Sequence, residues 1–127
     1  MDDTRKVALA GIELLERELI VRDFVTILNE GETHELLPFL AENVKYKPSP
    51  RQEVSGRNAV TEMIRSIRDT FEEWQTSLIT VAVSGERVLA EQVLRMRLPA
   101  RDAADIYGFA SFRLDGFRIS EWHQVHS

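Results

Sequence analysis

Apolar side chains recur every three or four residues in the first half of the chain, a pattern typical of amphipathic helices. Residues 4–29 follow this pattern and predict one long helix or two abutting helices. A short second helix is expected from Thr33, with Pro38 inside it as a residue that can kink the backbone. A third helix follows Gly56, and its apolar positions form a single stripe made of Val60, Ile64, Ile67, Phe71 and Trp74.

The second half of the chain predicts strands. β-Branched residues become frequent from Thr76 onward, and the pattern indicates four strands at about 76–84, 86–98, 104–114 and 117–126. A short strand is also expected at residues 44–47, ended by Pro48-Ser49-Pro50. Helices followed by an antiparallel sheet predict an α+β fold, in which a strongly curved sheet forms a cone around the N-terminal helices.

Length and composition favour one domain over residues 1–127. Such a chain, with 43% hydrophobic residues, can bury a core. It has no cysteine, which excludes disulfides, thiolate catalysis and sulfur-ligated zinc. Its net charge of −5 and its interspersed basic residues argue against nucleic acid as a partner. Because there is no long apolar run and no signal-peptide pattern at the start, we expect a cytoplasmic protein without a membrane partner.

Four segments of the chain resemble the nuclear transport factor 2-like superfamily: FVTILNEGETHELLPFLAENVKYKPSP, SGRNAV, VAVSGERVLAEQV and GFASFRLDGFRISEWHQ. Within it, the chain is most similar to limonene-epoxide-hydrolase-like and polyketide-cyclase-like (SnoaL-like) proteins, over about residues 17–124. The resemblance implies a cystatin-like α+β cone with an apolar pocket for a small molecule. It also implies a homodimer through the outer face of the sheet. We expect no cofactor.

The catalytic residues of the epoxide hydrolases are not repeated in this chain. That family has Glu-Arg-Val-Asp on a strand where this chain has Glu91-Gln92-Val93-Leu94. The aspartate that follows the tryptophan of the last strand is replaced by Gln124. Tyr46 matches a tyrosine of the family's site, but Pro48 stands where that site has an asparagine. The resemblance therefore implies the fold without its charged acid–base set.

The ketosteroid isomerases are a second group of relatives, and their catalytic set is also missing. Phe24, Lys47 and Ala110 stand at about the positions of their tyrosine, aspartate base and protonated aspartic acid. We therefore expect a pocket that is mostly apolar and neutral.

Strand alternation predicts which side chains face that pocket. If Gln92 and Trp122 point inward, alternate residues on the same strands share their side. His123 and Val125 then face outward, with Val93, Tyr107 and Phe109 as the apolar centre of the dimer face. The residues expected to line the pocket are Phe24, Ala90, Gln92, Leu94, Met96, Gly108, Ala110, Phe112, Leu114, Ser120, Trp122, Gln124 and His126.

Four polar residues, Tyr46, Gln92, Gln124 and His126, are the candidate catalytic residues. His126 is a general acid or base by its near-neutral pKa, or a histidine at a frayed terminus. For the two glutamines, one expectation is that they hold a ligand oxygen, and the alternative is that they hydrogen-bond to each other. Tyr46 donates to a ligand, or plugs the cone. A metal site is not expected, because residues three apart on a strand, such as His123 and His126, face opposite ways.

Two classes of function are compatible with such a pocket. The first is an isomerase, cyclase, dehydratase or hydrolase that acts on a small apolar substrate by positioning it. The second is a ligand-binding or assembly module without catalysis. The loss of ionisable residues favours this second class, whereas the small residues Gly108 and Ala110 in the pocket floor favour a bound ligand.

Overall fold

The computed structural model describes residues 2–126, so that residues 1 and 127 of the expected domain lie outside the described part. Helix α1 spans Asp2–Glu30 without interruption, so the first segment is one long helix and not two abutting helices. It is followed by η1, Thr33–Phe39, a 3-10 helix that contains Pro38. Helix α2 spans Arg57–Thr70. The prediction that Trp74 belongs to the third helix is wrong, because the backbone turns extended at Phe71 and Trp74 lies in the next strand.

Six strands form one sheet in the order β2-β1-β6-β5-β4-β3. Their bounds are β1 Leu40–Ser49, β2 Gln52–Ser55, β3 Glu73–Ser84, β4 Arg87–Arg97, β5 Ala104–Asp115 and β6 Arg118–His126. The sequence predicted a purely antiparallel sheet. The sheet is instead mixed, because β1 pairs parallel with β6. Pro50 lies in the turn between β1 and β2, so the prolines bend the chain into a hairpin and do not end the sheet.

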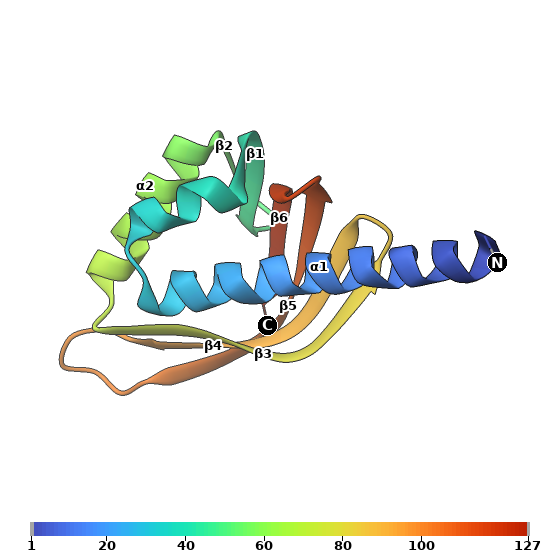
Figure 1. Cartoon of the computed structure of the whole chain (residues 1–127). Coiled ribbons are helices and arrows are strands. Elements are labelled where there is room, and N and C mark those ends of the chain that lie inside the picture. Colours follow the sequence, from blue (N-terminus) through green and yellow to red (C-terminus); the bar gives the residue numbers. More distant parts are fainter. Residues whose placement is uncertain (1, 127) are drawn as a thin grey trace.

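The sheet curves around α1, and α2 packs on η1 and β1 at one end (Figure 1). Fully or almost fully buried side chains fill the space between the helices and the concave face. Each large apolar side chain buried in this way contributes about 1.5–3 kcal/mol to folding. The largest are Phe24, Leu28, Leu36, Leu40, Ile64, Phe112, Leu114, Ile119 and Trp122.

A bulge in β6 corrects one predicted side-chain orientation. Arg113 pairs with Glu121 while Leu114 pairs with Ile119, so Ser120 is an extra residue between two pairs. Ile119 is fully buried, whereas the Ser120 hydroxyl donates to the Arg113 carbonyl at 3.2 Å. The prediction that Ser120 faces inward with Trp122 is therefore wrong, because one extra residue reverses the alternation.

Asn29, in the last turn of α1, fixes this helix to the open edge of the sheet. Its Nδ2 donates to the Thr76 carbonyl at 2.7 Å, and the Thr76 N–H donates to its Oδ1 at 2.8 Å. Because β3 is an edge strand, these two bonds satisfy backbone groups that lack a neighbouring strand. The helix thus lies at a defined height over the inner face of the sheet.

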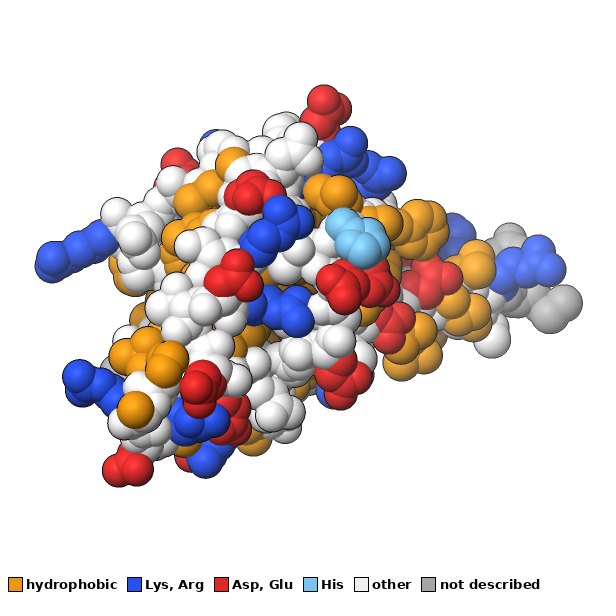
Figure 2. Space-filling view, turned by 90° about the vertical axis from the view of Figure 1, so that its left-hand side faces the viewer, with side chains coloured by type: hydrophobic (Ala, Val, Ile, Leu, Met, Phe, Trp, Pro, Cys, Tyr) orange, Lys and Arg blue, Asp and Glu red, His pale blue; other side chains and the backbone are white. Residues whose placement is uncertain are grey.

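Charges of both signs are interspersed on the surface, as Figure 2 shows for one side of the molecule. Among the described residues, no group of three or more His, Asp or Glu side chains is placed to hold a metal ion. Within residues 2–126, no helix combines the length and apolarity needed to cross a membrane.

Candidate functional site

The four candidate catalytic residues meet on the concave face as two hydrogen-bonded pairs. The first pair is Tyr46 of β1 and Gln124 of β6, which lie on neighbouring parallel strands. The Tyr46 hydroxyl donates to Gln124 Oε1 at 2.8 Å, and the two residues are 2% and 5% exposed. Burial raises the pKa of Tyr46 far above its ordinary value. The phenol therefore keeps its proton and acts as a hydrogen-bond donor, not as a base.

The second pair is Gln92 of β4 and His126 of β6. Gln92 Nε2 lies 3.2 Å from His126 Nε2. An amide nitrogen can only donate, so in this arrangement the imidazole Nε2 accepts and the ring proton resides on Nδ1. His126 is half-buried, and desolvation lowers its pKa. At neutral pH it is therefore uncharged and able to accept a proton. His126 also pairs with Gly108 in the sheet, which ties down the strand end.

Gly108 on β5 allows the second pair to form across an intervening strand. It is the register partner of both Gln92 and His126. A Cβ at this position would lie 2.3 Å from the Val125 carbonyl oxygen and 2.6 Å from His126 Cδ2. Both contacts are closer than non-bonded atoms tolerate. The absence of a side chain at Gly108 is thus what lets the imidazole lie over β5 and reach Gln92.

Aromatic rings fill the centre of the cone beside these pairs. Trp122 stacks on Tyr46 with ring centroids 4.0 Å apart, and Phe24 meets its edge at 5.1 Å. Phe112 stacks on Trp122 from the other side at 6.0 Å. The predicted ligand-binding residues Phe24, Leu94, Ala110, Phe112 and Trp122 are all buried, and Met96 is half-buried.

Three buried polar atoms have no hydrogen-bond partner within the described part of the chain: Gln92 Oε1, Trp122 Nε1 and Thr76 Oγ1. Most buried polar atoms in proteins are satisfied, so such atoms mark places where water or a ligand binds. Gln92 Oε1 is an acceptor, Trp122 Nε1 is a donor, and the hydroxyl is both. Sequence reasoning missed Thr76. Alternation could have indicated it, since Leu78, two residues on, pairs with Gln92 in the sheet.

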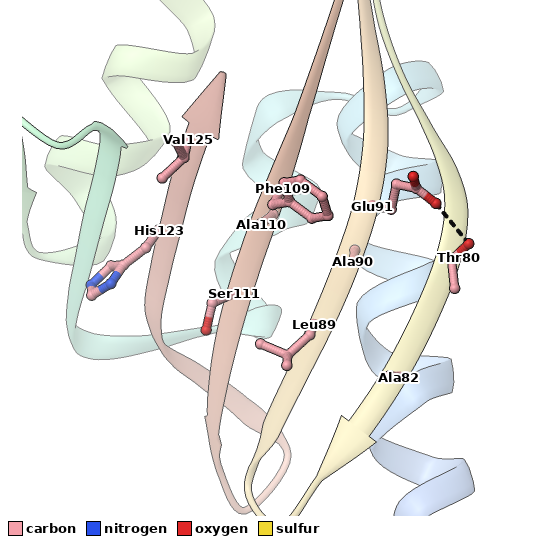
Figure 3. A pocket seen from close by; sticks show the side chains of 10 residues that line it. All are labelled: Thr80, Ala82, Leu89, Ala90, Glu91, Phe109, Ala110, Ser111, His123 and Val125. Atoms are coloured by element: carbon pink, nitrogen blue, oxygen red, sulfur yellow. Dashed lines mark hydrogen bonds between the residues drawn. The ribbon is translucent and has the colours of Figure 1, made fainter. Parts of the chain in front are cut away.

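The outer face of the sheet carries a hollow of about 490 Å³ (Figure 3). We call it the outer hollow, and its lining is Thr80, Ala82, Leu89, Ala90, Glu91, Phe109, Ala110, Ser111, His123 and Val125. His123 and Val125 lie here as predicted, and Phe109 and Val125 are each 55% exposed. Sequence reasoning predicted an apolar outer face but no hollow, because concavity depends on how strongly the sheet curves.

Glu91 is the acidic side chain of the outer hollow, and it is held in place by its neighbours. It accepts hydrogen bonds from the Tyr107 hydroxyl and from Thr80 Oγ1, the latter at 2.8 Å. These two bonds lower the pKa of Glu91, with the Tyr107 bond as the larger cause. Its carboxylate belongs to the outer face and does not reach the inner pairs, because its strand neighbour Gln92 points the opposite way.

A curved six-stranded sheet closed by α1, with polar side chains on its concave face, defines the nuclear transport factor 2-like class of protein, also known from ketosteroid isomerases. The model of the SnoaL-like domain family matches residues 21–122. The chain belongs to this family.

Solved structures with the same fold include proteins described as polyketide cyclases and as epoxide hydrolases. A protein described as a polyketide cyclase from Xanthomonas campestris is 22% identical, with a TM-score of 0.81 over 90% of this chain and 92% of that one. An LEH-like epoxide hydrolase of M. tuberculosis is 16% identical, with a TM-score of 0.82 over 91% and 85%. SalBIII, an epoxide hydrolase/cyclase-like enzyme of pyran ring formation in salinomycin, is 19% identical, with a TM-score of 0.80 over 89% and 92%. No curated protein sequence matches the chain.

Proposed function

We propose that this protein binds a small apolar molecule with a neutral polar group inside the cone and catalyses an isomerisation, cyclisation, dehydration or hydrolysis of it. The observation that carries the proposal is the pair of neutral hydrogen-bonded couples, Tyr46–Gln124 and Gln92–His126, on one concave face. Beside them, Gln92 Oε1 and Trp122 Nε1 have no hydrogen-bond partner among residues 2–126. A ligand that offers a donor to the first and an acceptor to the second fits this arrangement.

The chemistry of such a site rests on positioning and on one proton acceptor. Holding reacting groups in the correct geometry lowers a barrier by up to about 7–11 kcal/mol. His126 is neutral at pH 7, and its Nε2 can remove a proton from a ligand hydroxyl that replaces the Gln92 N–H as its hydrogen-bond donor, while the amide of Gln92 or Gln124 orients an oxygen. Ring closure within one molecule suits these groups, because the nucleophile is already part of the substrate. The relation to SalBIII, which is named for pyran ring formation, supports this choice.

Hydrolysis by the charged set of the limonene-epoxide hydrolases does not fit the residues present. Gln92, Leu94 and Gln124 occupy the three charged positions, and none can deprotonate a water molecule. We expect no turnover of limonene oxide at a rate comparable with an authentic epoxide hydrolase. Formation of the diol at such a rate, measured by gas chromatography, would refute this part of the proposal.

The proposal is tested with epoxy alcohols. The hydroxyl oxygen attacks an epoxide carbon as its proton passes to His126, the epoxide C–O bond breaks, and the released oxygen takes the proton back from the imidazolium, so that a cyclic ether with one hydroxyl forms. Binding is followed by tryptophan fluorescence, because Trp122 lies beside the site. Products are separated by gas chromatography before mass spectrometry, because the cyclic ether is an isomer of the epoxy alcohol and has the same mass. We expect Gln92→Leu to weaken binding, and His126→Phe to reduce turnover more than binding. The control is His123→Phe, since this histidine lies on the same strand but lines the outer hollow. Equal effects of both histidine substitutions would contradict an inner site.

A non-catalytic ligand-binding or assembly module is the second candidate, and the filled interior favours it. Tyr46, Trp122 and Phe24 are each at most 2% exposed and in ring contact. If the epoxy alcohols bind but no product forms, the protein is a ligand-binding module without catalysis.

We also propose that a second copy covers the outer hollow and forms a homodimer. Its apolar centre contains Phe109 and Val125, and side chains exposed to this degree on one face are typical of an interface. Phe109→Asp should lower the molar mass measured by light scattering. Phe117→Asp is the matched control, since Phe117 is 72% exposed but lies outside the outer hollow. A wild-type monomer at hundreds of micromolar would overturn the dimer.

A further inference from the structure

The N-terminal half of α1 projects past the β3–β4 hairpin into solvent (Figure 1). Large apolar side chains are exposed from this half of α1 to just beyond its middle: Ile12 is 51%, Leu15 68% and Leu19 58% accessible. Together with exposed Ala8 they form what we call the α1 stripe. Single exposed apolar residues are ordinary, but four on one helix face form a contiguous patch of the kind that marks an interaction site.

The α1 stripe lies on the side of the helix that faces away from the core. An α-helix advances about 100° per residue, so residues 8, 12, 15 and 19 fall within a narrow sector of its circumference. Val21, Phe24 and Leu28, which are buried against the sheet, lie roughly 160° away from that sector. A partner can therefore cover the stripe without touching the sheet or the inner site.

We propose that the α1 stripe binds the same stripe of a second copy in an antiparallel helix pair. The intervals between its residues are four, three and four, and this spacing is the same in both directions along the helix. Antiparallel pairing about a twofold axis sets Ala8 against Leu19 and Ile12 against Leu15. Such alternation of three and four is the spacing of helices that pack nearly side by side.

Charge complementarity favours the antiparallel direction. Arg5 and Asp23 are both exposed and lie on the same flank of the stripe, about 50° from its centre. In the antiparallel pair, Arg5 of each copy lies beside Asp23 of the other. In a parallel pair, Arg5 of one copy and Asp23 of the other lie at opposite ends of the stripe, so this ion pair cannot form. The core-facing sides of the two helices point away from each other, so the two folded bodies remain apart.

The size of the contact predicts its strength. From residue 8 to residue 19 the stripe is about 16 Å long, which is less than the contact of a typical stable dimer with about 800 Å² buried per partner. The pairing should therefore depend on concentration. If the outer hollow also pairs, the two interfaces together link dimers into larger assemblies.

Disulfide cross-linking tests the pairing directly, because the chain contains no cysteine of its own. A variant with both Ile12→Cys and Leu15→Cys places thiols opposite each other in the antiparallel pair, within the Cα separation of roughly 4.4–6.8 Å that a disulfide needs. We expect a covalent dimer on mild oxidation, seen by non-reducing electrophoresis. The matched control is Leu19→Cys alone, since its two copies lie about 16 Å apart in this arrangement.

Each outcome is decisive. Efficient cross-linking of Leu19→Cys shows parallel pairing and overturns the proposal, because the double variant can cross-link in either direction. Absence of cross-links in the double variant at hundreds of micromolar protein also overturns the proposal. So does a protein that stays monomeric and sediments with lipid vesicles, because the α1 stripe would then bind a membrane surface. In the double-cysteine background, Arg5→Asp should reduce the yield several-fold, and adding Asp23→Arg should restore it. Repeating the experiment with Phe109→Asp separates this interface from the outer hollow.

Discussion

The buried hydrogen bond between Tyr46 and Gln124 gives the sharpest test of the inner site. Tyr46→Phe removes the donor but keeps the ring that stacks on Trp122 at 4.0 Å. Gln124 Oε1 then loses its 2.8 Å partner in a position that is 5% exposed. Leaving a buried acceptor without a partner costs about 1–3 kcal/mol. We expect the free energy of unfolding to fall by this amount.

Substitution of Gln124 removes the acceptor of the same hydrogen bond. Gln124→Leu conserves the approximate volume and leaves the Tyr46 hydroxyl without its acceptor, again at a cost of about 1–3 kcal/mol. In the double variant neither polar atom remains. Its loss should be smaller than the sum of the single losses by about 1–3 kcal/mol, because the desolvation penalty is no longer incurred.

Urea unfolding followed by circular dichroism measures all four proteins of this cycle. The slopes with denaturant must agree, so that the differences reflect stability and not a change in the unfolded state. Additive losses, within about 0.5 kcal/mol, would mean that the two side chains do not interact and would refute the hydrogen-bond geometry.

Three further predictions concern the elements around the site. Gly108→Ala should lower stability by about 1–3 kcal/mol through overpacking against β6, measured by thermal unfolding, and an unchanged protein would contradict the close approach. Because burial lowers the pKa of His126, the unfolded chain binds this proton more readily than the folded protein. The contribution of His126 to the free energy of unfolding is therefore fully present above about pH 6.5 and is lost as the pH falls through the folded-state pKa. His126→Phe should make the free energy of unfolding, measured by denaturant titration, less dependent on pH in this range. Asn29→Ala should cost about 1–3 kcal/mol and increase amide exchange at Thr76, whereas exposed Asn43→Ala should have almost no effect; equal behaviour of the two would show that the edge contact is not stabilising.

Local patterns predicted most of the secondary structure because they depend on near neighbours. The stripe from Val60 to Ile67 predicted α2, and alternation predicted β4 and β5 to within a few residues. The parallel pairing of β1 with β6 could not be predicted in this way, since it joins residues about 75 positions apart. The bulge at Ser120 was missed for a related reason. It is defined by the register of β5 against β6, which one strand alone does not specify.

The same distinction applies to the candidate site. Alternation anchored on the family match at Trp122 and Gln124 correctly oriented His123 and Val125, because side-chain direction is a property of one strand. Hydrogen-bond partners depend on several strands at once. One of the two expectations for Gln92 and Gln124 was a hydrogen bond between them, yet each bonds to a different residue. Gly108 opens a path from Gln92 to His126.

Neutral amides at positions 92 and 124 change which ligands the cone can accept. Both residues are almost completely buried, at 0% and 5% exposure. A charged side chain at such a depth requires an opposite charge or several hydrogen bonds, because desolvation of an ion costs several kcal/mol. An amide requires neither and offers both a donor and an acceptor. We therefore expect ligands that are themselves uncharged. A carboxylate brought against Gln92 Oε1 would face an acceptor without a compensating charge, so the free acid of any substrate should bind much more weakly than its methyl ester.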